Sequence, residues 1–349
     1  MGVPDSAVVR LERAVKRTWP NVRAARSAAD DMRASLAAVL EDETGPDTVL
    51  VAYGSLARGE FTQGSDLDWT LLVNGPASPE QLESIPRIRA KLAAVHGTGP
   101  NPTGPFGSIS SGYELVHRIG GESDTNRITT QRVLLLLESI PIRDTQHDLL
   151  AHDRVVRAVL NSYLAQSSGT RERSGVPRFL LNDMVRYWRT MGVDYAAKRR
   201  ERDDSKWALR RLKLRTSRKL IFAAGLVMCL DYHVRVVKRD GQAPDRAKLL
   251  DNLVMHVGHS PLEALALVAL SDPEMTNLGG ALFDAYDRFL GLLGDKDRRN
   301  ALESLGREGA DDVPVHQEAE AIGDDFGAAV EAFFFDSSYA SAIRSYGVF

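Results

Sequence analysis

Apolar and polar positions follow three different patterns along the chain. In residues 6–40 the apolar side chains recur at helical spacing, which predicts one or two leading helices broken near Pro20. Two short apolar runs, 48–53 and 67–73, are rich in strand-forming residues and predict buried strands. Helical patterns over 78–95 and 128–140 lie among these runs, and from about residue 150 onward the spacing is helical throughout.

These patterns predict an α+β fold, in which a small mixed sheet forms a core and an α-helical domain follows it. We expect an N-terminal helical segment over residues 1–45, the α/β core over 46–150 and the helical domain over 151–349. Residues 96–108 are rich in Gly and Pro and predict a loop over a site. Residues 111–119 after it are a candidate third strand.

Composition indicates an ordinary soluble globular protein, because 43% of the residues are hydrophobic and 26% are charged. The longest apolar run, residues 220–230, has 11 residues and is too short to cross a bilayer, so we expect no membrane partner. The first residues carry charges where a signal peptide needs an apolar centre, which predicts a cytoplasmic protein. The single cysteine, Cys229, excludes an internal disulfide and a cysteine-based zinc site.

Charge is distributed unevenly along the chain. The net charge is −3, yet residues 171–248 hold 21 Lys and Arg against 9 Asp and Glu, a local balance of +12. Such a basic segment favours a polyanion such as a nucleoside triphosphate or RNA, although a solvated helical face gives the same pattern. Lys206, Arg210 and Lys213 follow one helical stripe and are the candidate nucleotide-binding cations of this segment.

One motif carries candidate chemistry, the sequence YGSLARGEFTQGSDLDWTLLV over residues 53–73. Asp66 and Asp68 are separated by one residue, so on a strand both carboxylates would point to one face. Two carboxylates on one face repel each other unless a cation lies between them. The Gly54-Ser55 pair directly after the first apolar run predicts a turn whose backbone N–H groups and hydroxyl could hold phosphate.

The combination of strand, Gly54-Ser55, Asp66-x-Asp68 and second strand resembles the DNA polymerase β-like nucleotidyltransferases. Within that superfamily the "RGE" and "SDLD" stretches, with the later RITTQRVLLLLESIPI, resemble the branch of uridylyltransferases that modify nitrogen-signalling regulatory proteins. The resemblance covers about residues 48–143. It implies that Asp66 and Asp68 hold two Mg²⁺ (or Mn²⁺) ions and that Gly54 and Ser55 hold the triphosphate.

The resemblance also implies a third carboxylate on a later strand, often the general base. Glu114 is the first candidate because it falls on the candidate strand, and Glu122, Asp124 and Glu138 are its alternatives. Arg58 is a further candidate for phosphate binding, with a local ion pair as the alternative.

The predicted reaction is transfer of NMP from an NTP to a hydroxyl acceptor, on a protein or an RNA, with release of pyrophosphate. A second possibility is a bacterial defence or signalling enzyme that makes an oligonucleotide or cyclic nucleotide messenger. A third is a catalytically silent partner protein that binds nucleotide. Oligomeric state and base preference stay open.

Overall fold

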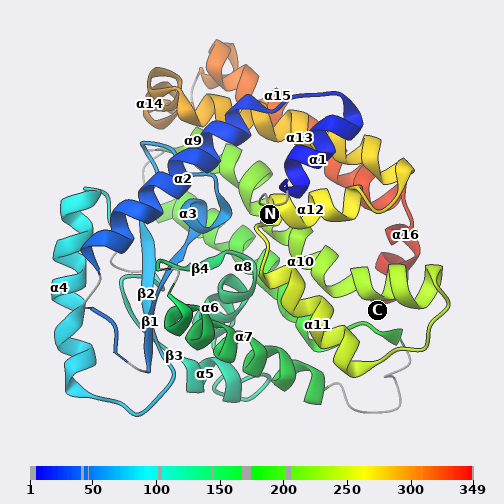
Figure 1. Cartoon of the computed structure of the whole chain (residues 1–349). Helices are drawn as coiled ribbons and strands as arrows, with labels where there is room; N and C mark the ends of the chain where they lie inside the picture. The colour runs from blue at the N-terminus through cyan, green and yellow to red at the C-terminus, as the bar shows by residue number, and fades with distance from the viewer. Residues whose placement is uncertain are drawn as a thin grey trace. The chain divides into compact units, whose positions relative to one another are not determined.

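A computed structural model of the 349-residue chain describes residues 5–40, 43–45, 47–100, 104–143, 145–166, 174–201, 206–307 and 309–347 (Figure 1). The chain forms two compact units. The sheet unit is Ala25–Ser168, and the helical unit combines Met1–Ala24 with Gly169–Phe349. These bounds differ from the predicted ones, since a helix over Gln146–Gln166 runs across residue 150. The predicted division into functional domains stays a prediction.

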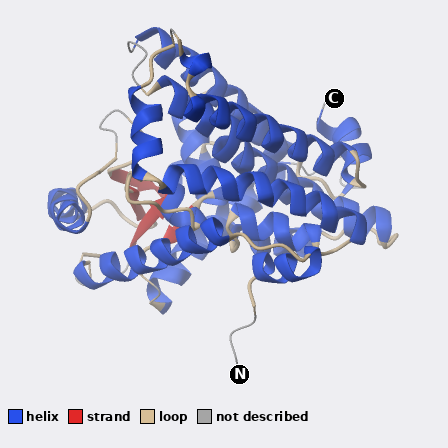
Figure 2. Ribbon diagram, turned by 90° about the horizontal axis from the view of Figure 1, so that it is seen from above, coloured by secondary structure: helices blue, strands red, loops and turns tan. Residues whose placement is uncertain are grey.

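The sheet unit is built on four short strands, coloured red in Figure 2. They are β1 (Thr48–Tyr53), β2 (Asp68–Val73), β3 (Ser108–Ser111) and β4 (Ser139–Pro141). The strand order is β3-β2-β1-β4, with β1 antiparallel to β2 and β4, and β3 parallel to β2. Together with the many helices, this mixed sheet confirms the predicted α+β class.

Helices cover both faces of this sheet. They are the second half of α2 (Pro20–Val39), α3 (Gly54–Arg58), α4 (Pro79–Val95), α5 (Gly112–His117), α6 (Asn126–Leu137) and α7 (Gln146–Gln166). Leu50 and Ala52 of β1 share one hydrophobic cluster with side chains of α2 and α4. The alternate residues Val49 and Val51 are equally buried but lie outside that cluster, and α7 packs against β1. The strands are therefore buried on both faces, as their uninterrupted apolar runs require.

Local sequence signals explain where the predicted helices begin. Ser78 accepts a hydrogen bond from the backbone N–H of Glu80, and the Gln81 side chain accepts one from the backbone N–H of Ser78. This capping box, with Pro79 at the first helical position, starts α4 where the sequence predicts it. The break near Pro20 is also confirmed, since α1 (Ala7–Val15) ends before α2 begins there.

The predicted third strand over residues 111–119 is wrong beyond its first residue. The strand β3 ends at Ser111, and Gly112–His117 form the helix α5. The Ser111 hydroxyl accepts a hydrogen bond from the backbone N–H of Glu114 (3.4 Å), which caps a helix at this point. The mixed apolar and polar order of these residues fits a strand or a short helix equally well, and the cap decides for the helix.

The helical unit contains the rest of the chain. Its elements are α1, α8 (Arg178–Glu201), α9 (Trp207–Lys213), the π-helix η2 (Leu214–Arg218), α10 (Lys219–Tyr232), the π-helix η3 (His233–Arg239), α11 (Arg246–Val257), α12 (Pro261–Ala269), α13 (Pro273–Gly294), α14 (Lys296–Ser304), the 3₁₀ turn η4 (Ala310–Asp312), α15 (Pro314–Phe335), α16 (Tyr339–Ala342) and the π-helix η5 (Ile343–Gly347). The helix α1 packs on α12 and α13, so the first residues belong to this unit. Continuous helix over Trp207–Arg239 is long and apolar enough to cross a membrane, but 72% of its apolar window is buried inside the structure. This burial is compatible with the core helix of a soluble protein.

Candidate active site

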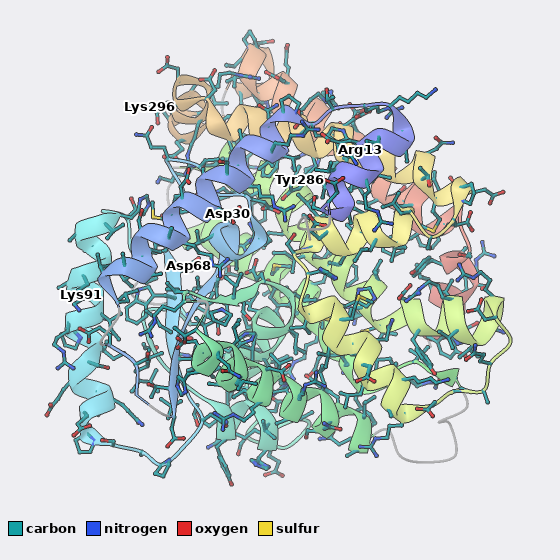
Figure 3. All side chains as sticks on the ribbon, viewed as in Figure 1. Arg13, Asp30, Asp68, Lys91, Tyr286 and Lys296 are labelled. Atoms are coloured by element: carbon teal, nitrogen blue, oxygen red, sulfur yellow. The ribbon has the colours of Figure 1, made fainter. Side chains whose placement is uncertain are left out.

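The sequence motif is assembled at one end of the sheet. The antiparallel register pairs Tyr53, the last residue of β1, with Asp68, the first residue of β2, and also with Ser139 of β4. Gly54 and Ser55 follow Tyr53 directly as the first residues of α3. The Gly-Ser turn and the second aspartate therefore meet at the same end of neighbouring strands. Figure 3 labels Asp68.

Asp68 lies directly against Gly54. Gly54 has a φ of +67°, and a Cβ added to it would lie 3.2 Å from Oδ2 of Asp68. A side chain at this position would therefore be strained and would crowd the carboxylate. Gly54 is the residue type that lets the carboxylate approach the start of α3, where no side chain caps the first turn.

The face of the sheet that carries Asp68 is set by its neighbours. Leu67, Trp69 and Leu71 belong to the cluster under α2 and α4, so the intervening Asp68 and Thr70 point to the other face. The Thr70 hydroxyl donates to the phenolic oxygen of Tyr53 (3.3 Å), which places Tyr53 on that face as well.

Asp66 lies in the loop before β2. Its side chain is exposed, and the strand begins only at Asp68. The expectation that both aspartates sit on one strand is therefore wrong for Asp66, because the ladder with β1 ends at the Tyr53–Asp68 pair. The loop nevertheless leads straight into β2, and the carboxylates remain two residues apart at the same end of the sheet.

Tyr53, the first residue of the motif, and Phe106 lie close to Asp68 or to each other, and sequence reasoning gave neither of them a place in the site. Their rings lie 5.0 Å apart, and the backbone N–H of Gly107 donates to the carbonyl of Trp69 (2.7 Å), which extends the β3 side of the sheet toward Asp68. Burial raises the pKa of Tyr53 to about 12, so its phenol stays protonated at neutral pH. The position of Tyr53 directly before Gly54-Ser55 could have pointed to its place beside Asp68, whereas the sequence around Phe106 gave no such signal.

Arg58 is buried between two carboxylates. Its Nε donates to Oε2 of Glu60 (2.8 Å), and its Nη1 forms a short ion pair with Oε2 of Glu138. Only 7% of the Arg58 side chain is exposed. The structure thus favours local ion pairing over phosphate binding for Arg58. Glu138, one of the alternatives for the third carboxylate, is a partner in this ion pairing.

Glu114 is not brought to the aspartates. It lies on α5, beyond the end of β3 where Ser111 pairs with Val73. Val73 and Asp68 lie at opposite ends of β2. At the usual rise per residue of a strand, their Cα atoms are about 17 Å apart. Glu114 forms an exposed ion pair with Arg118 (2.9 Å). Of its alternatives, Asp124 binds the buried Arg132 (2.8 Å).

Residues 34–97, the segment that holds Gly54, Ser55, Asp66 and Asp68, match the nucleotidyltransferase domain family. The chain contains a nucleotidyltransferase domain. It is of the polymerase β-like kind, and it identifies the protein as an enzyme that transfers nucleotidyl groups. No curated protein and no solved structure matches the chain. The resemblance to the uridylyltransferase branch stays a prediction.

The donor set of the nucleotidyltransferase domain fits magnesium. Nucleotidyltransferases of this family usually use divalent metal ions. Within the described ranges no three His, Cys, Asp or Glu side chains gather into a metal site. Mg²⁺ is commonly held by one or two carboxylates and completes its shell with water and substrate phosphates. Asp66 and Asp68 could therefore hold such an ion, and this assignment stays a prediction.

The candidate cations Lys206, Arg210 and Lys213 lie outside the nucleotidyltransferase domain, on the helical unit. Lys206 precedes α9, and its ammonium pairs with Glu303 (3.2 Å). Arg210 and Lys213 lie on α9 and are partly buried. The structure thus places two of the three on one helix, and their contact with nucleotide stays a prediction.

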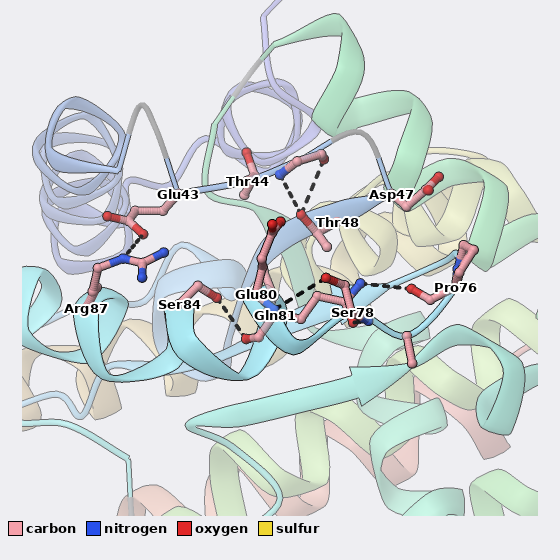
Figure 4. Close-up of a pocket in the computed structure, with 13 residues that line it drawn as sticks. Glu43, Thr44, Asp47, Thr48, Pro76, Ser78, Glu80, Gln81, Ser84 and Arg87 are labelled. Atoms are coloured by element: carbon pink, nitrogen blue, oxygen red, sulfur yellow. Dashed lines mark hydrogen bonds and ion pairs between the residues drawn. The ribbon is translucent and has the colours of Figure 1, made fainter.

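A cavity of about 450 Å³ in the sheet unit is remote from the motif (Figure 4). Thr48 and Leu71 line it together with the loops before β1 and after β2 and the first turns of α4. Thr48 begins β1 and pairs with Val73, so the cavity lies at the opposite end of the sheet from Asp68. None of the candidate site residues lines it.

Proposed function

We propose that the chain transfers a nucleoside monophosphate from an NTP to a hydroxyl group on a protein or RNA acceptor. The observation that carries this proposal is the contact of the Asp68 carboxylate with Gly54, within a segment that matches the nucleotidyltransferase domain. Gly54 and Ser55 are proposed to hold the triphosphate, and Asp66 and Asp68 to hold Mg²⁺ or Mn²⁺. We also propose that the protein acts in the cytoplasm, the location that the sequence predicts.

The chemistry explains these assignments. The acceptor oxygen forms a bond to the α-phosphorus, the bond from the α-phosphorus to the bridging oxygen breaks, and pyrophosphate leaves with that oxygen. The acceptor proton passes to solvent or to a phosphate oxygen. When bound, the divalent ions supply charge neutralisation and a more acidic acceptor hydroxyl.

The chain's own residues bind and orient the reactants. Two carboxylates at one end of the sheet fix the place where positive charge gathers. The turn at Gly54-Ser55 brings backbone N–H groups and a hydroxyl to that place, where the triphosphate would lie. Lys206, Arg210 and Lys213 are proposed to bind the nucleotide through the helical unit, as the +12 balance of residues 171–248 suggests.

The test is nucleotide transfer from each of the four NTPs labelled at the α-phosphate, with Mg²⁺ or Mn²⁺, alone and with total RNA. Label in RNA or in added protein supports transfer to a macromolecule. Label in a small product without acceptor supports synthesis of a messenger. We expect Asp68→Ala to lower the rate by about 100-fold or more.

Asp47→Ala is the matched control, because Asp47 lies just before β1 at the other end of the same sheet and lines the remote cavity. It should transfer nucleotide at the wild-type rate. An equal rate in Asp68→Ala and wild type, or no transfer by wild type from any NTP, would refute the proposal. The second result would favour the silent nucleotide-binding partner.

A further inference from the structure

The two aspartates of the motif are held in place by different means. Asp68 is the first residue of β2 and is fixed by its pairing with Tyr53. Asp66 precedes the strand, so it has no partner in the ladder, and its side chain is exposed. The position of Asp66 relative to Asp68 therefore depends on the hydrogen bonds and contacts that fix the loop of residues 61–67.

Bonds on both sides of Asp66 hold this loop. Before it, the backbone N–H of Ser65 donates to the carbonyl of Thr62 (2.9 Å), and the Ser65 hydroxyl accepts from the backbone N–H of Thr62 (3.0 Å). After it, the backbone N–H of Leu67 donates to the carbonyl of Thr98 (3.0 Å). These bonds close a turn and tie one side of Asp66 to the segment that follows α4.

A further bond comes from a side chain outside the loop. Nε2 of His96 lies 2.7 Å from the carbonyl oxygen of Ser65. Because a carbonyl oxygen only accepts hydrogen bonds, Nε2 is the donor, in the neutral ring as well as in the protonated one. His96 thus holds the peptide group that joins Ser65 to Asp66.

His96 is itself well anchored. Its backbone N–H donates to the carbonyl of Leu92 (2.9 Å) at the end of α4. Its ring meets the ring of Phe61 edge to face, with centroids 5.3 Å apart, and Phe61 belongs to the core cluster of the sheet unit. A side chain fixed at both its backbone and its ring can transmit the rigidity of α4 to the loop.

We propose that His96 is a positioning residue for the metal site: it holds the Ser65 carbonyl so that the Asp66 carboxylate stays beside Asp68. This role rests on the proposed function. Residues outside the ligand set that orient metal ligands commonly affect metal affinity by 10-fold to 100-fold. His96 would act in this way through the backbone rather than through the ligand's own side chain.

The test compares His96→Ala with wild type in the full chain. Mn²⁺ affinity in the presence of an NTP is measured by electron paramagnetic resonance, separately from transfer activity. We expect the Mn²⁺ affinity of His96→Ala to fall about tenfold. The transfer rate should recover at high metal concentration, because the ligands themselves remain. His96→Gln should recover most of the affinity, since its amide N–H can donate to the same carbonyl.

His147→Ala is the matched control. Nε2 of His147 also contacts a backbone carbonyl, that of Gly45 (3.1 Å), but at the opposite end of the sheet from Asp68. It should leave the Mn²⁺ affinity unchanged. Amide hydrogen exchange of residues 61–67 reports whether the loop is released, and we expect faster exchange only in His96→Ala.

Equal Mn²⁺ affinity in wild type and His96→Ala would overturn the positioning role, and so would faster loop exchange without a change of affinity. A wild-type protein that binds Mn²⁺ but transfers no nucleotide would overturn the proposed function alone. A weaker Mn²⁺ affinity in His96→Ala would still support the positioning role in that case.

Discussion

Gly54 shows how one residue without a side chain can set the geometry of a site. Its φ of +67° is in the left-handed region, and a Cβ there would crowd the Asp68 carboxylate at 3.2 Å. Gly59 ends the same short helix with a φ of +69°, but a Cβ there would meet only Cγ of Arg26 at 3.8 Å. The two glycines therefore share a backbone conformation that would strain any other residue, and they differ in their contact with Asp68.

We expect Gly54→Ala to lower nucleotide transfer by about tenfold or more and Gly59→Ala to leave it nearly unchanged. Both should destabilise the fold by about 1–2 kcal/mol, because an L-residue is strained in this region. Transfer rates and urea unfolding of the two variants separate these effects. Equal losses of activity in both would mean that strain in α3, and not contact with Asp68, controls the site.

At the residue scale, we expect the buried His152 to make the stability of the fold depend on pH. Burial lowers its pKa to about 4 from the ordinary 6.5, and its Nε2 lies 2.8 Å from the hydroxyl of Ser139. As pH falls below 6.5 the unfolded chain gains a proton that the folded chain does not accept until about pH 4. Stability is therefore lost progressively between these values, by about 2 kcal/mol at pH 5.

His152→Gln should remove most of this loss, as measured by urea unfolding at pH 7.5 and pH 5. The exposed His147, replaced in the same way, should keep the wild-type dependence. If His152→Gln lost as much stability as wild type between pH 7.5 and pH 5, another group would be the cause of the loss.

At the scale of elements, a buried ion cluster ties α3 to β4. Arg58 at the end of α3 bonds to Glu60 and to Glu138, the residue directly before β4. Both carboxylates have at most 2% of their side chains exposed. Removing Arg58 would take away the positive charge that both buried carboxylates share, whereas an exposed pair contributes little.

We expect Arg58→Ala to lower the free energy of unfolding by about 3–5 kcal/mol, because both carboxylates lose their shared cation. Glu114→Ala, which breaks only the exposed pair with Arg118, should cost less than about 1 kcal/mol and keep nucleotide transfer. Denaturant unfolding and transfer assays of both variants check this. Loss of transfer in a stable Glu114→Ala protein would restore Glu114 as a catalytic candidate.

The elements that the sequence predicted well are those with strong local patterns. The strands β1 and β2 and the helix α4 follow from apolar runs, helical spacing and the Ser78 cap, all within a few residues. The short helix α5 was missed because six residues carry too little periodicity to separate helix from strand. Gly54 and Asp68 were predictable as a motif, because residue types and their spacing are local features of the sequence, and their chemical roles stay predictions.

The contacts that join distant residues were not predictable. Glu138 is 80 residues from Arg58, and His96 is 31 residues from Ser65. Both are common residue types with several ordinary explanations. Nothing local distinguishes such a residue from a surface charge or a core histidine, and only the fold brings it to its partner.

At the scale of the whole molecule, ion pairs neutralise part of the positive charge of the basic segment, residues 171–248. Arg211 binds Glu320 through two hydrogen bonds (2.7 and 2.8 Å), and Arg215 pairs with Glu320 (2.8 Å) and Asp324. Acidic residues about a hundred positions further along the chain thus neutralise part of the +12 balance. Arg211 and Arg215 therefore have structural partners within the helical unit.

The last prediction separates these structural cations from the candidate nucleotide-binding ones. We expect the double variant Arg210→Ala/Lys213→Ala to raise the KM for NTP by about tenfold with little change in kcat, because lost charge weakens binding of the triphosphate in ground and transition state alike. Its KM should also depend less on salt than that of wild type, because screening acts on the charges it lacks. Arg211→Ala, one position further along the same helix, should instead lower stability by about 1 kcal/mol and leave KM unchanged, since Glu320 loses its bidentate partner. Steady-state kinetics at 0.05 and 0.5 M salt, with thermal unfolding of each variant, measure both effects. An unchanged KM in the double variant would mean that the triphosphate is held by the sheet unit alone.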